Sequence, residues 1–189
     1  EGYNETLEAR IRERTAQLER TQQVGIFSLA KLAESRDNET GAHILRTQRY
    51  IKALAEHLRT HPRFAGELDD ETIDLLYKSA PLHDIGKVGI PDAILLKPGK
   101  LTEQEFSVMK RHQKIGAEAL KISEKELGSN SFLRLGREIS LTHHEKWDGS
   151  GYPAGLRGDE IPVSGRLMAV ADVYDALISK RVYKPAFSH

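Results

Sequence analysis

Apolar residues recur every three or four positions along most of this chain, and no stretch of useful length alternates between apolar and polar residues. The first spacing is typical of helices that bury one face, whereas alternation is typical of strands. We therefore predict an all-α fold, in which a long N-terminal linker helix precedes a helical domain.

The first 35 residues are predicted to form one long helix. They lack proline, are rich in charged residues, and place Leu7, Ile11, Leu18 and Leu32 near the four-three spacing of a coiled coil. Polar residues interrupt this seam, so a weak parallel homodimer and a solvated helix without a partner are both open at this point. We predict that residues 1–35 form a linker or coiled-coil helix and that residues 36–189 form a separate domain.

Five further helices are predicted in that domain. The apolar pattern and its flanking signals place them at about 44–58, 69–80, 102–120, 132–146 and 163–179. Pro62 and Pro81 mark the ends of the first two, and Thr102 with Glu105 forms a capping-box pattern at the start of the third. A loop rich in glycine and proline, residues 147–162, separates the last two helices.

The composition excludes several classes of protein. The 28 basic residues balance the 28 acidic ones, which argues against a nucleic-acid polymer as partner. Cysteine is absent, so disulfides and thiolate zinc sites are excluded. The chain has neither a long apolar run nor a signal-peptide pattern, so we expect no membrane segment in this fragment and a cytoplasmic location.

Histidine and acidic residues fall on the predicted helices in a pattern that favours a metal centre. Two doublets, His83-Asp84 and His143-His144, are hard to explain as core residues, because neighbouring side chains on a helix project about 100° apart. Asp172 lies in the apolar stretch LMAVADVYDAL, where an unpaired carboxylate is costly. A single histidine is more often an ordinary polar residue than a ligand, but the whole set predicts a cluster of ions, with Asp84 as the bridging carboxylate. The candidate ligands are Glu39, His43, His83, Asp84, His112, His143, His144 and Asp172.

The expected ions follow from the ligand types. Imidazole and carboxylate without thiolate suit iron, manganese, zinc, nickel or cobalt. Two such ions a few ångströms apart can hold the attacking and leaving oxygens of a phosphodiester and activate water at neutral pH.

Two stretches then suggest a specific family. HDIGK (83–87) and HHEKWDGSGYPAGLRGDEIP (143–162) resemble the signatures of the HD-GYP family, a branch of the HD phosphohydrolase superfamily, and RDNETGAH (36–43) and GRLMAVADVYDALISKRVYK (165–184) resemble its flanking motifs. The resemblance covers roughly residues 30–187. It implies a metal-dependent phosphodiesterase that cleaves cyclic di-GMP to pGpG and onward to GMP. It also implies further helices beyond residue 185, and we expect these C-terminal helices to be missing from residues 36–189.

The resemblance also assigns roles to single residues. His83, Asp84, His112, His143, His144 and Asp172 would form a two-metal site, with iron as the first choice of ion, and Glu39 and His43 match positions that hold a third metal in some members. Lys87, Arg181 and Lys184 match basic positions that contact the ligand phosphates, and Gly151, Tyr152 and Pro153 would shape the pocket wall and a surface for a partner protein. We expect Glu145 and Asp148 to orient metal ligands.

The resemblance further implies an output domain of a signalling protein, with a receiver or other sensor domain upstream, as in two-component systems. Two other functions stay open: a metal-loaded module that senses cyclic di-GMP or docks a partner with little activity, and a nucleotide phosphohydrolase of the wider HD superfamily.

Overall fold

The computed structural model describes residues 2–36, 42–127 and 131–179, and all regular structure within these ranges is helical. This confirms the all-α prediction. No helix in the described part of the chain combines the length and the apolar character that crossing a membrane requires.

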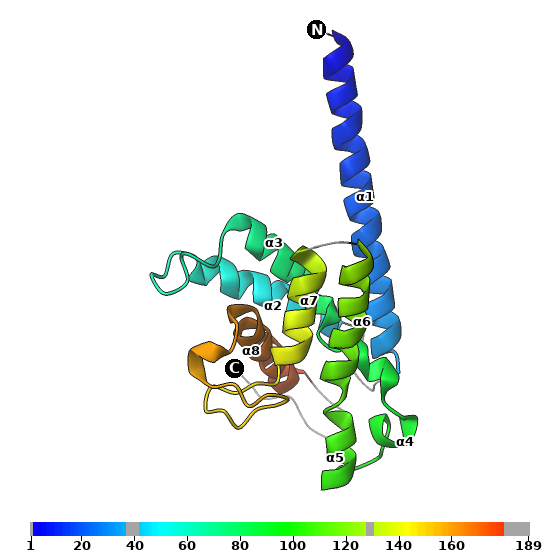
Figure 1. Ribbon diagram of the computed structural model, residues 1–189, viewed down its shortest axis with the longest axis vertical. Helices are drawn as coiled ribbons and strands as arrows, with labels where there is room; N and C mark the ends of the chain where they lie inside the picture. The colour runs from blue at the N-terminus through cyan, green and yellow to red at the C-terminus, as the bar shows by residue number, and fades with distance from the viewer. Residues whose placement is uncertain (1, 37–41, 128–130, 180–189) are drawn as a thin grey trace.

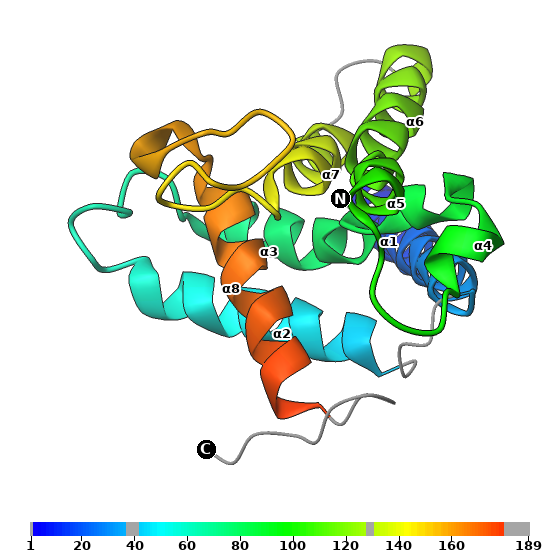
Figure 2. The ribbon, with the colours of Figure 1, turned by 90° about the horizontal axis from the view of Figure 1, so that it is seen from below.

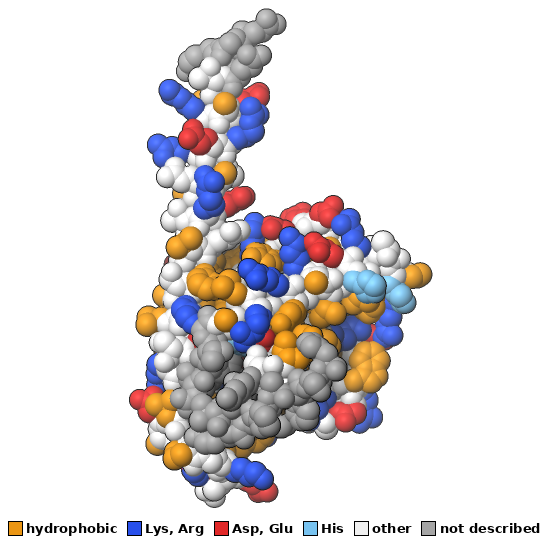
Figure 3. Space-filling view, turned by 180° about the vertical axis from the view of Figure 1, so that it is seen from behind, with side chains coloured by type: hydrophobic (Ala, Val, Ile, Leu, Met, Phe, Trp, Pro, Cys, Tyr) orange, Lys and Arg blue, Asp and Glu red, His pale blue; other side chains and the backbone are white. Residues whose placement is uncertain are grey.

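The N-terminal residues form the single long helix predicted, α1 (Gly2–Glu34). Its first half projects away from the other helices (Figure 1), and its described side chains are charged and other polar ones with isolated apolar ones between them (Figure 3). Its last turns lie against the body of the molecule, where Ala30 and Ala33 are buried and Ile26 packs against an apolar cluster. Only the C-terminal part of α1 is therefore held by the domain.

The main core lies between four helices: α2 (His43–Leu58), α3 (Asp70–Ser79), α7 (Ser131–Thr142) and α8 (Val163–Ile178). Each contributes a large and almost fully buried side chain, respectively Ile51, Leu76, Ile139 and Met168, with exposures of 0 to 1%. Figure 2 shows α8 lying across α2. A second cluster, Leu82, Leu120, Phe132 and Leu133, joins α7 to α6 (His112–Leu127).

The region predicted as the third core helix is two helices, α5 (Glu103–Met109) and α6. The capping box at its start is confirmed, since Thr102 Oγ1 accepts a hydrogen bond from the Glu105 amide and the Glu105 carboxylate accepts one from the Thr102 amide. The helix breaks at Lys110 and Arg111, and Met109 O accepts a hydrogen bond of 2.7 Å from His112 Nδ1. The break thus reorients His112, which a pattern of apolar spacing does not reveal.

The fourth predicted helix ends earlier than expected, at Thr142 in place of about Lys146. His143 and His144 therefore lie in a turn, and placing them on the helix was wrong. The His143 ring accounts for the difference, because its Nδ1 lies 3.0 Å from Ile139 O and 3.1 Å from Ser140 O, two carbonyls of the last helical turn.

Short elements that the sequence pattern did not predict complete the fold. They are the 3-10 helices η1 (Ala80–Leu82), η2 (Ile85–Gly89) and η3 (Gly158–Glu160) and the short α4 (Asp92–Leu95). The first two follow α3 directly, and the residues between them are His83 and Asp84.

Candidate metal centre

The His83-Asp84 pair lies where η1 gives way to η2, close to the start of α6. Pro81 lacks an amide hydrogen, so α3 does not continue as a regular helix through this point. Gly86 then allows η2 to approach α6 very closely, since a Cβ atom at residue 86 would lie 1.8 Å from His112 O. These two features bring Asp84 up to His112.

Three buried histidines present their Nε2 atoms to the same carboxylate. The Nδ1 atoms of His83, His112 and His143 face backbone carbonyl oxygens, at 2.9 Å from Ala80 O, 2.7 Å from Met109 O and 3.0 Å from Ile139 O. A carbonyl oxygen only accepts hydrogen bonds, so each Nδ1 carries the proton and donates. In the neutral ring, Nε2 is then left with its lone pair, which is the form that binds a metal.

Asp84 directs its two oxygens toward different histidines. Oδ1 lies 3.3 Å from His112 Nε2 and 3.5 Å from His143 Nε2, whereas Oδ2 lies 3.4 Å from His83 Nε2. An arrangement of this kind is what a carboxylate needs if it is to bridge two ions.

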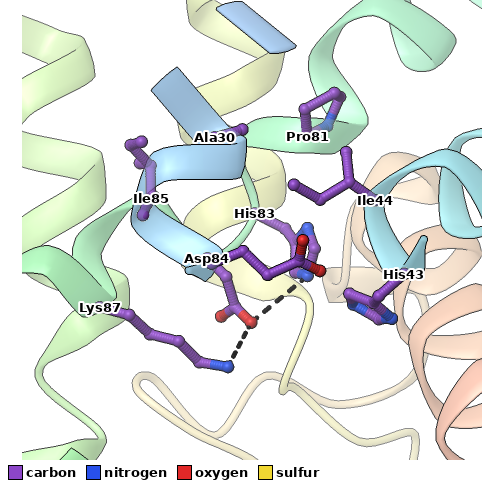
Figure 4. A pocket seen from close by; sticks show the side chains of 10 residues that line it. Ala30, His43, Ile44, Pro81, His83, Asp84, Ile85 and Lys87 are labelled. Carbon is purple, nitrogen blue, oxygen red and sulfur yellow. Dashed lines mark ion pairs between the residues drawn. The ribbon is translucent and has the colours of Figure 1, made fainter. Parts of the chain in front are cut away.

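The ligand atoms fall into two neighbouring groups. Asp84, His112, His143 and His144 form one group, and His43, His83 and Asp172 form the other; within each, the ligand atoms lie within 4.8 Å of one another. His43 comes from α2, His83 and Asp84 from the η1–η2 segment (Figure 4), and Asp172 from α8. Thus His43, which the resemblance implied for a third ion, lies with His83 and Asp172.

The side chains present fit divalent ions. Among the described residues, the Nε2 atoms of His83, His112 and His143 and Oδ1 of Asp84 are buried and have no hydrogen-bond partner. Buried polar atoms are normally satisfied, and here they converge at distances too long, or in directions too poor, for hydrogen bonds to each other. A metal ion satisfies such atoms, and imidazole with carboxylate is a suitable donor set.

The pKa values of the site in its metal-free form follow from the same geometry. Burial lowers the pKa of His83, but the charge of Asp84 outweighs it and raises the pKa to about 9. Burial also raises the pKa of Asp84, yet Lys87 and His83 bring it well below its usual value. The pKa of His144 falls to about 2 because the ring is buried and lies beside His143. The metal-free centre therefore holds a proton on His83 and a neutral ring on His144.

Comparison with known families agrees with this site. A family model described as an HD domain matches residues 29–189, most of the chain. The chain belongs to the HD domain family. The stretches HDIGK and GYP, both within the matched range, assign it to the HD-GYP branch.

Relatives of this HD domain are named for hydrolysis of cyclic dinucleotides. A Vibrio cholerae protein named cyclic di-GMP phosphodiesterase is 70% identical over 169 residues, which cover 89% of this chain and 34% of that protein. A second Vibrio cholerae protein, named probable cyclic di-GMP phosphodiesterase, is 55% identical over 100% of this chain and 43% of its own length. A third from the same organism, named 3'3'-cGAMP-specific phosphodiesterase 2, is 48% identical over 84% of this chain and 28% of its own length. The chain thus spans less than half the length of each of these relatives.

The GYP loop, which is the glycine- and proline-rich loop of residues 147–162, covers one side of the two groups of ligand atoms. The Tyr152 ring stacks on the His144 ring, with centroids 4.9 Å apart and an angle of 30°. Gly151 lets the loop fold back, because a Cβ there would lie 2.3 Å from the Lys146 amide nitrogen. Burial, together with the charge of Asp84, raises the pKa of Tyr152 to about 12, so the phenol stays neutral. Pro153 follows directly in the same loop.

Among the described residues, Glu145 and Asp148 form side-chain hydrogen bonds within this loop and none with the metal ligands. The buried Glu145 carboxylate accepts hydrogen bonds from the amides of Ala154, at 2.8 Å, and Leu156, at 3.0 Å. Asp148 accepts from the Ser150 amide at 2.9 Å. The expectation that both residues orient metal ligands is therefore corrected: they shape the loop that carries Tyr152.

Asp175 is a residue of the site that sequence reasoning missed. Its carboxylate is 1% exposed and lies 2.8 Å from His43 Nδ1, and Arg46 donates to both its oxygens, at 2.5 and 2.9 Å. Asp175 follows Asp172 by three residues on α8, so the two carboxylates share one face of the helix. The three-residue spacing of two aspartates within an apolar stretch is the sequence feature from which Asp175 could have been predicted as a site residue.

Lys87 lies at the edge of the centre, and its Nζ atom is 2.8 Å from Asp84 Oδ2. Three other predicted site residues, Glu39, Arg181 and Lys184, lie outside the described residues. Their roles stay predictions.

Proposed function

We propose that this chain hydrolyses the phosphodiester bonds of cyclic di-GMP with divalent metal ions, giving pGpG, and GMP where cleavage continues. The observation that carries the proposal is that Asp84 belongs to one group of metal-ligand atoms and that its Oδ2 lies 3.4 Å from His83 Nε2 of the other group. The names of the relatives that are 70% and 55% identical support the choice of substrate.

Divalent ions held by these groups would supply Lewis acidity toward a phosphodiester and water activated at neutral pH. The protein's own contribution starts with Lys87, whose ammonium lies beside Asp84 and suits a point contact with a phosphate oxygen. Arg181 and Lys184 are proposed as further phosphate contacts. The Tyr152 ring, stacked on His144, covers that side of the site.

The two groups of ligand atoms favour at least two ions. We propose iron, with manganese, nickel, cobalt or zinc as substitutes, since this ligand set accepts all five. A third ion held by Glu39 belongs to the same proposal, and metal analysis of a Glu39→Ala variant tests it by a loss of about one ion per chain relative to wild type.

We also propose that the domain is the output part of a signalling protein. Residues 1–35 would be the linker helix and residues 36–189 the phosphodiesterase domain, with the last turns of the helix seated on it. The projecting half of α1 suits a parallel homodimer that receives a signal from an upstream receiver or sensor domain (Figure 1). The outer face of the GYP loop, where Trp147 is 55% exposed, is the proposed contact for a partner protein.

A second candidate substrate is 3'3'-cGAMP, because a relative named for that activity is 48% identical over 84% of the chain. An assay of the iron- or manganese-loaded protein with each dinucleotide, with products separated by chromatography, tests both candidates. We expect cyclic di-GMP to be cleaved with the higher kcat/KM. Faster cleavage of 3'3'-cGAMP would make that dinucleotide the preferred substrate in place of cyclic di-GMP. If the metal-loaded protein cleaved neither dinucleotide, the result would contradict the proposed function.

A further inference from the structure

The last turns of α1 form one wall of the pocket that contains part of the metal centre. A small pocket of about 20 Å³ is lined by Ala30, Ala33 and Glu34 of α1, by His43 and Ile44 of α2, and by residues of the η1–η2 segment that include His83, Asp84 and Lys87. Figure 4 shows Ala30 above this space, with His43, His83, Asp84 and Lys87 around it. A space of this size accepts a single ion or water molecule, since one water needs roughly 10–15 Å³ on the same measure.

The face of α1 that meets the pocket is selected by side-chain size. Ala30, Ala33 and Glu34 follow the i, i+3, i+4 spacing of one helical face and are at most 9% exposed, whereas the neighbouring Leu29 and Leu32 are 62% and 67% exposed. The two alanines let the helix approach closely, and Glu34 is the long side chain of α1 that lines the pocket.

Arg36, which follows α1, ties the end of this helix to residues 88–92. Its guanidinium donates to Val88 O, to Ile90 O at 3.2 Å and to Asp92 Oδ1 at 2.6 Å. The chain is therefore anchored to the η2–α4 segment two residues after Glu34, which holds the Glu34 carboxylate against the pocket.

One of the two oxygens of the Glu34 carboxylate is buried without a hydrogen-bond partner among the described residues. Oε2 accepts a hydrogen bond of 3.3 Å from Lys31 Nζ, but Oε1 is buried and has no hydrogen-bond partner among the described residues. A buried carboxylate oxygen without a partner is costly, so a group that enters the pocket must satisfy it. An anion next to Oε1 itself is disfavoured, because the Glu34 carboxylate would repel it. A divalent cation suits an oxygen of this kind.

We propose that Glu34 is a cation-binding residue of this pocket, supplied by the linker helix. Seating of the last turn of α1 and loading of the pocket with a divalent ion are then coupled, because Oε1 is in place only when Ala30 and Ala33 are packed against the η1–η2 segment. The inference rests on the proposed metal-dependent function, and it adds α1 to the elements that hold the centre.

The test is metal affinity in matched variants of the whole chain. Glu34→Gln keeps the shape and removes the charge, Lys31→Gln removes only the ion-pair partner, and Glu118→Gln changes a glutamate with the same i,i+3 lysine pairing on an exposed surface, where Glu118 and Lys121 lie 3.8 Å apart. Equilibrium dialysis with Mn²⁺ should show the weakest-held ion bound at least about tenfold less tightly by Glu34→Gln, the low end of what loss of a supporting metal-site group costs. The other two variants should bind like wild type.

Either of two results overturns the proposal: wild-type affinity in Glu34→Gln, or an equal loss in Lys31→Gln, which would assign the effect to the ion pair. The metal-free Glu34→Gln protein should melt no lower than wild type, since it lacks a buried charge.

Should Glu34→Gln not fold, wild-type crystals soaked in Mn²⁺ decide the matter. An anomalous peak roughly 2.0–2.6 Å from Glu34 Oε1 supports the proposal, and its absence when the remaining peaks are present overturns it. Neither measurement uses cyclic di-GMP, so failure here and failure of the proposed hydrolysis are distinguishable.

Discussion

Lys87 Nζ lies 2.8 Å from Oδ2 of Asp84, the residue three positions earlier, and both side chains are largely buried. The same Oδ2 faces His83, while Oδ1 faces His112 and His143. The lysine thus balances part of the charge of the central carboxylate from outside the imidazole cluster. A rotatable ammonium at this edge suits a phosphate better than it suits a place among the metal ligands.

Replacing Lys87 should separate substrate binding from metal binding. In Lys87→Met we expect metal content near wild type and a fall in phosphodiesterase kcat/KM of about 10- to 150-fold, since a charge-assisted hydrogen bond contributes about 1.5–3 kcal/mol. Lys78→Met, which removes a lysine paired with Asp74 on the surface of α3, is the matched control. A Lys87 variant that loses its metal would show that the residue has been misplaced.

Metal loading should compete with a proton on His83. The pKa of His83 is raised to about 9 in the metal-free protein, so at pH 7 the ring is protonated and must lose that proton to become a ligand. Apparent metal affinity should therefore rise from pH 7 to about 9 and then level off. Calorimetric titration in two buffers of different ionisation enthalpy measures the released protons; equal heats in both buffers and an affinity independent of pH would contradict this.

Asp175 should control how firmly His43 is held. Asp175→Asn keeps the size of the side chain but weakens its bonds to His43 and Arg46, so we expect metal affinity to fall by about 10- to 100-fold, as for other groups that orient metal-binding histidines. Asp70→Asn, which breaks an Asp–Arg pair at the surface with Arg59, is the control. Unchanged metal affinity in Asp175→Asn would remove Asp175 from the site.

The projecting half of α1 should mediate a weak dimer. Leu7, Ile11 and Leu18 are 48%, 56% and 70% exposed, and a long isolated helix is marginal in water. Analytical ultracentrifugation should show a dimer that depends on concentration and is lost when residues 1–20 are deleted. The deletion stops there because Ile26 and Ala30 pack against the domain. A monomer at high micromolar concentration, or a dimer indifferent to the deletion, contradicts the prediction.

The sequence was sufficient to predict the helices and the convergence of the histidines. Apolar spacing located α1, α2, α3 and α8 closely, because a buried helical face leaves a periodic pattern. It missed the break before His112 and the early end of α7, because both depend on a histidine side chain bonding to a nearby carbonyl.

Tertiary contacts explain the residues that were missed. Glu34 resembles the other glutamates of a charged helix, and only its position against the η1–η2 segment shows that it is buried in the pocket. Asp175 was detectable in principle from its place in an apolar helix, but its partners His43 and Arg46 come from α2, more than a hundred residues earlier.

The central claim is that Asp84 organises a metal centre that hydrolyses cyclic di-GMP. The most direct measurement is the hydrolysis rate and the metal content of the same preparations of wild type and Asp84→Asn, the metal being measured by emission spectrometry. We predict at least two ions per wild-type chain and conversion of cyclic di-GMP to pGpG, with loss of most metal and a rate several orders of magnitude lower in the variant. Full metal content together with undiminished hydrolysis in Asp84→Asn would contradict the account.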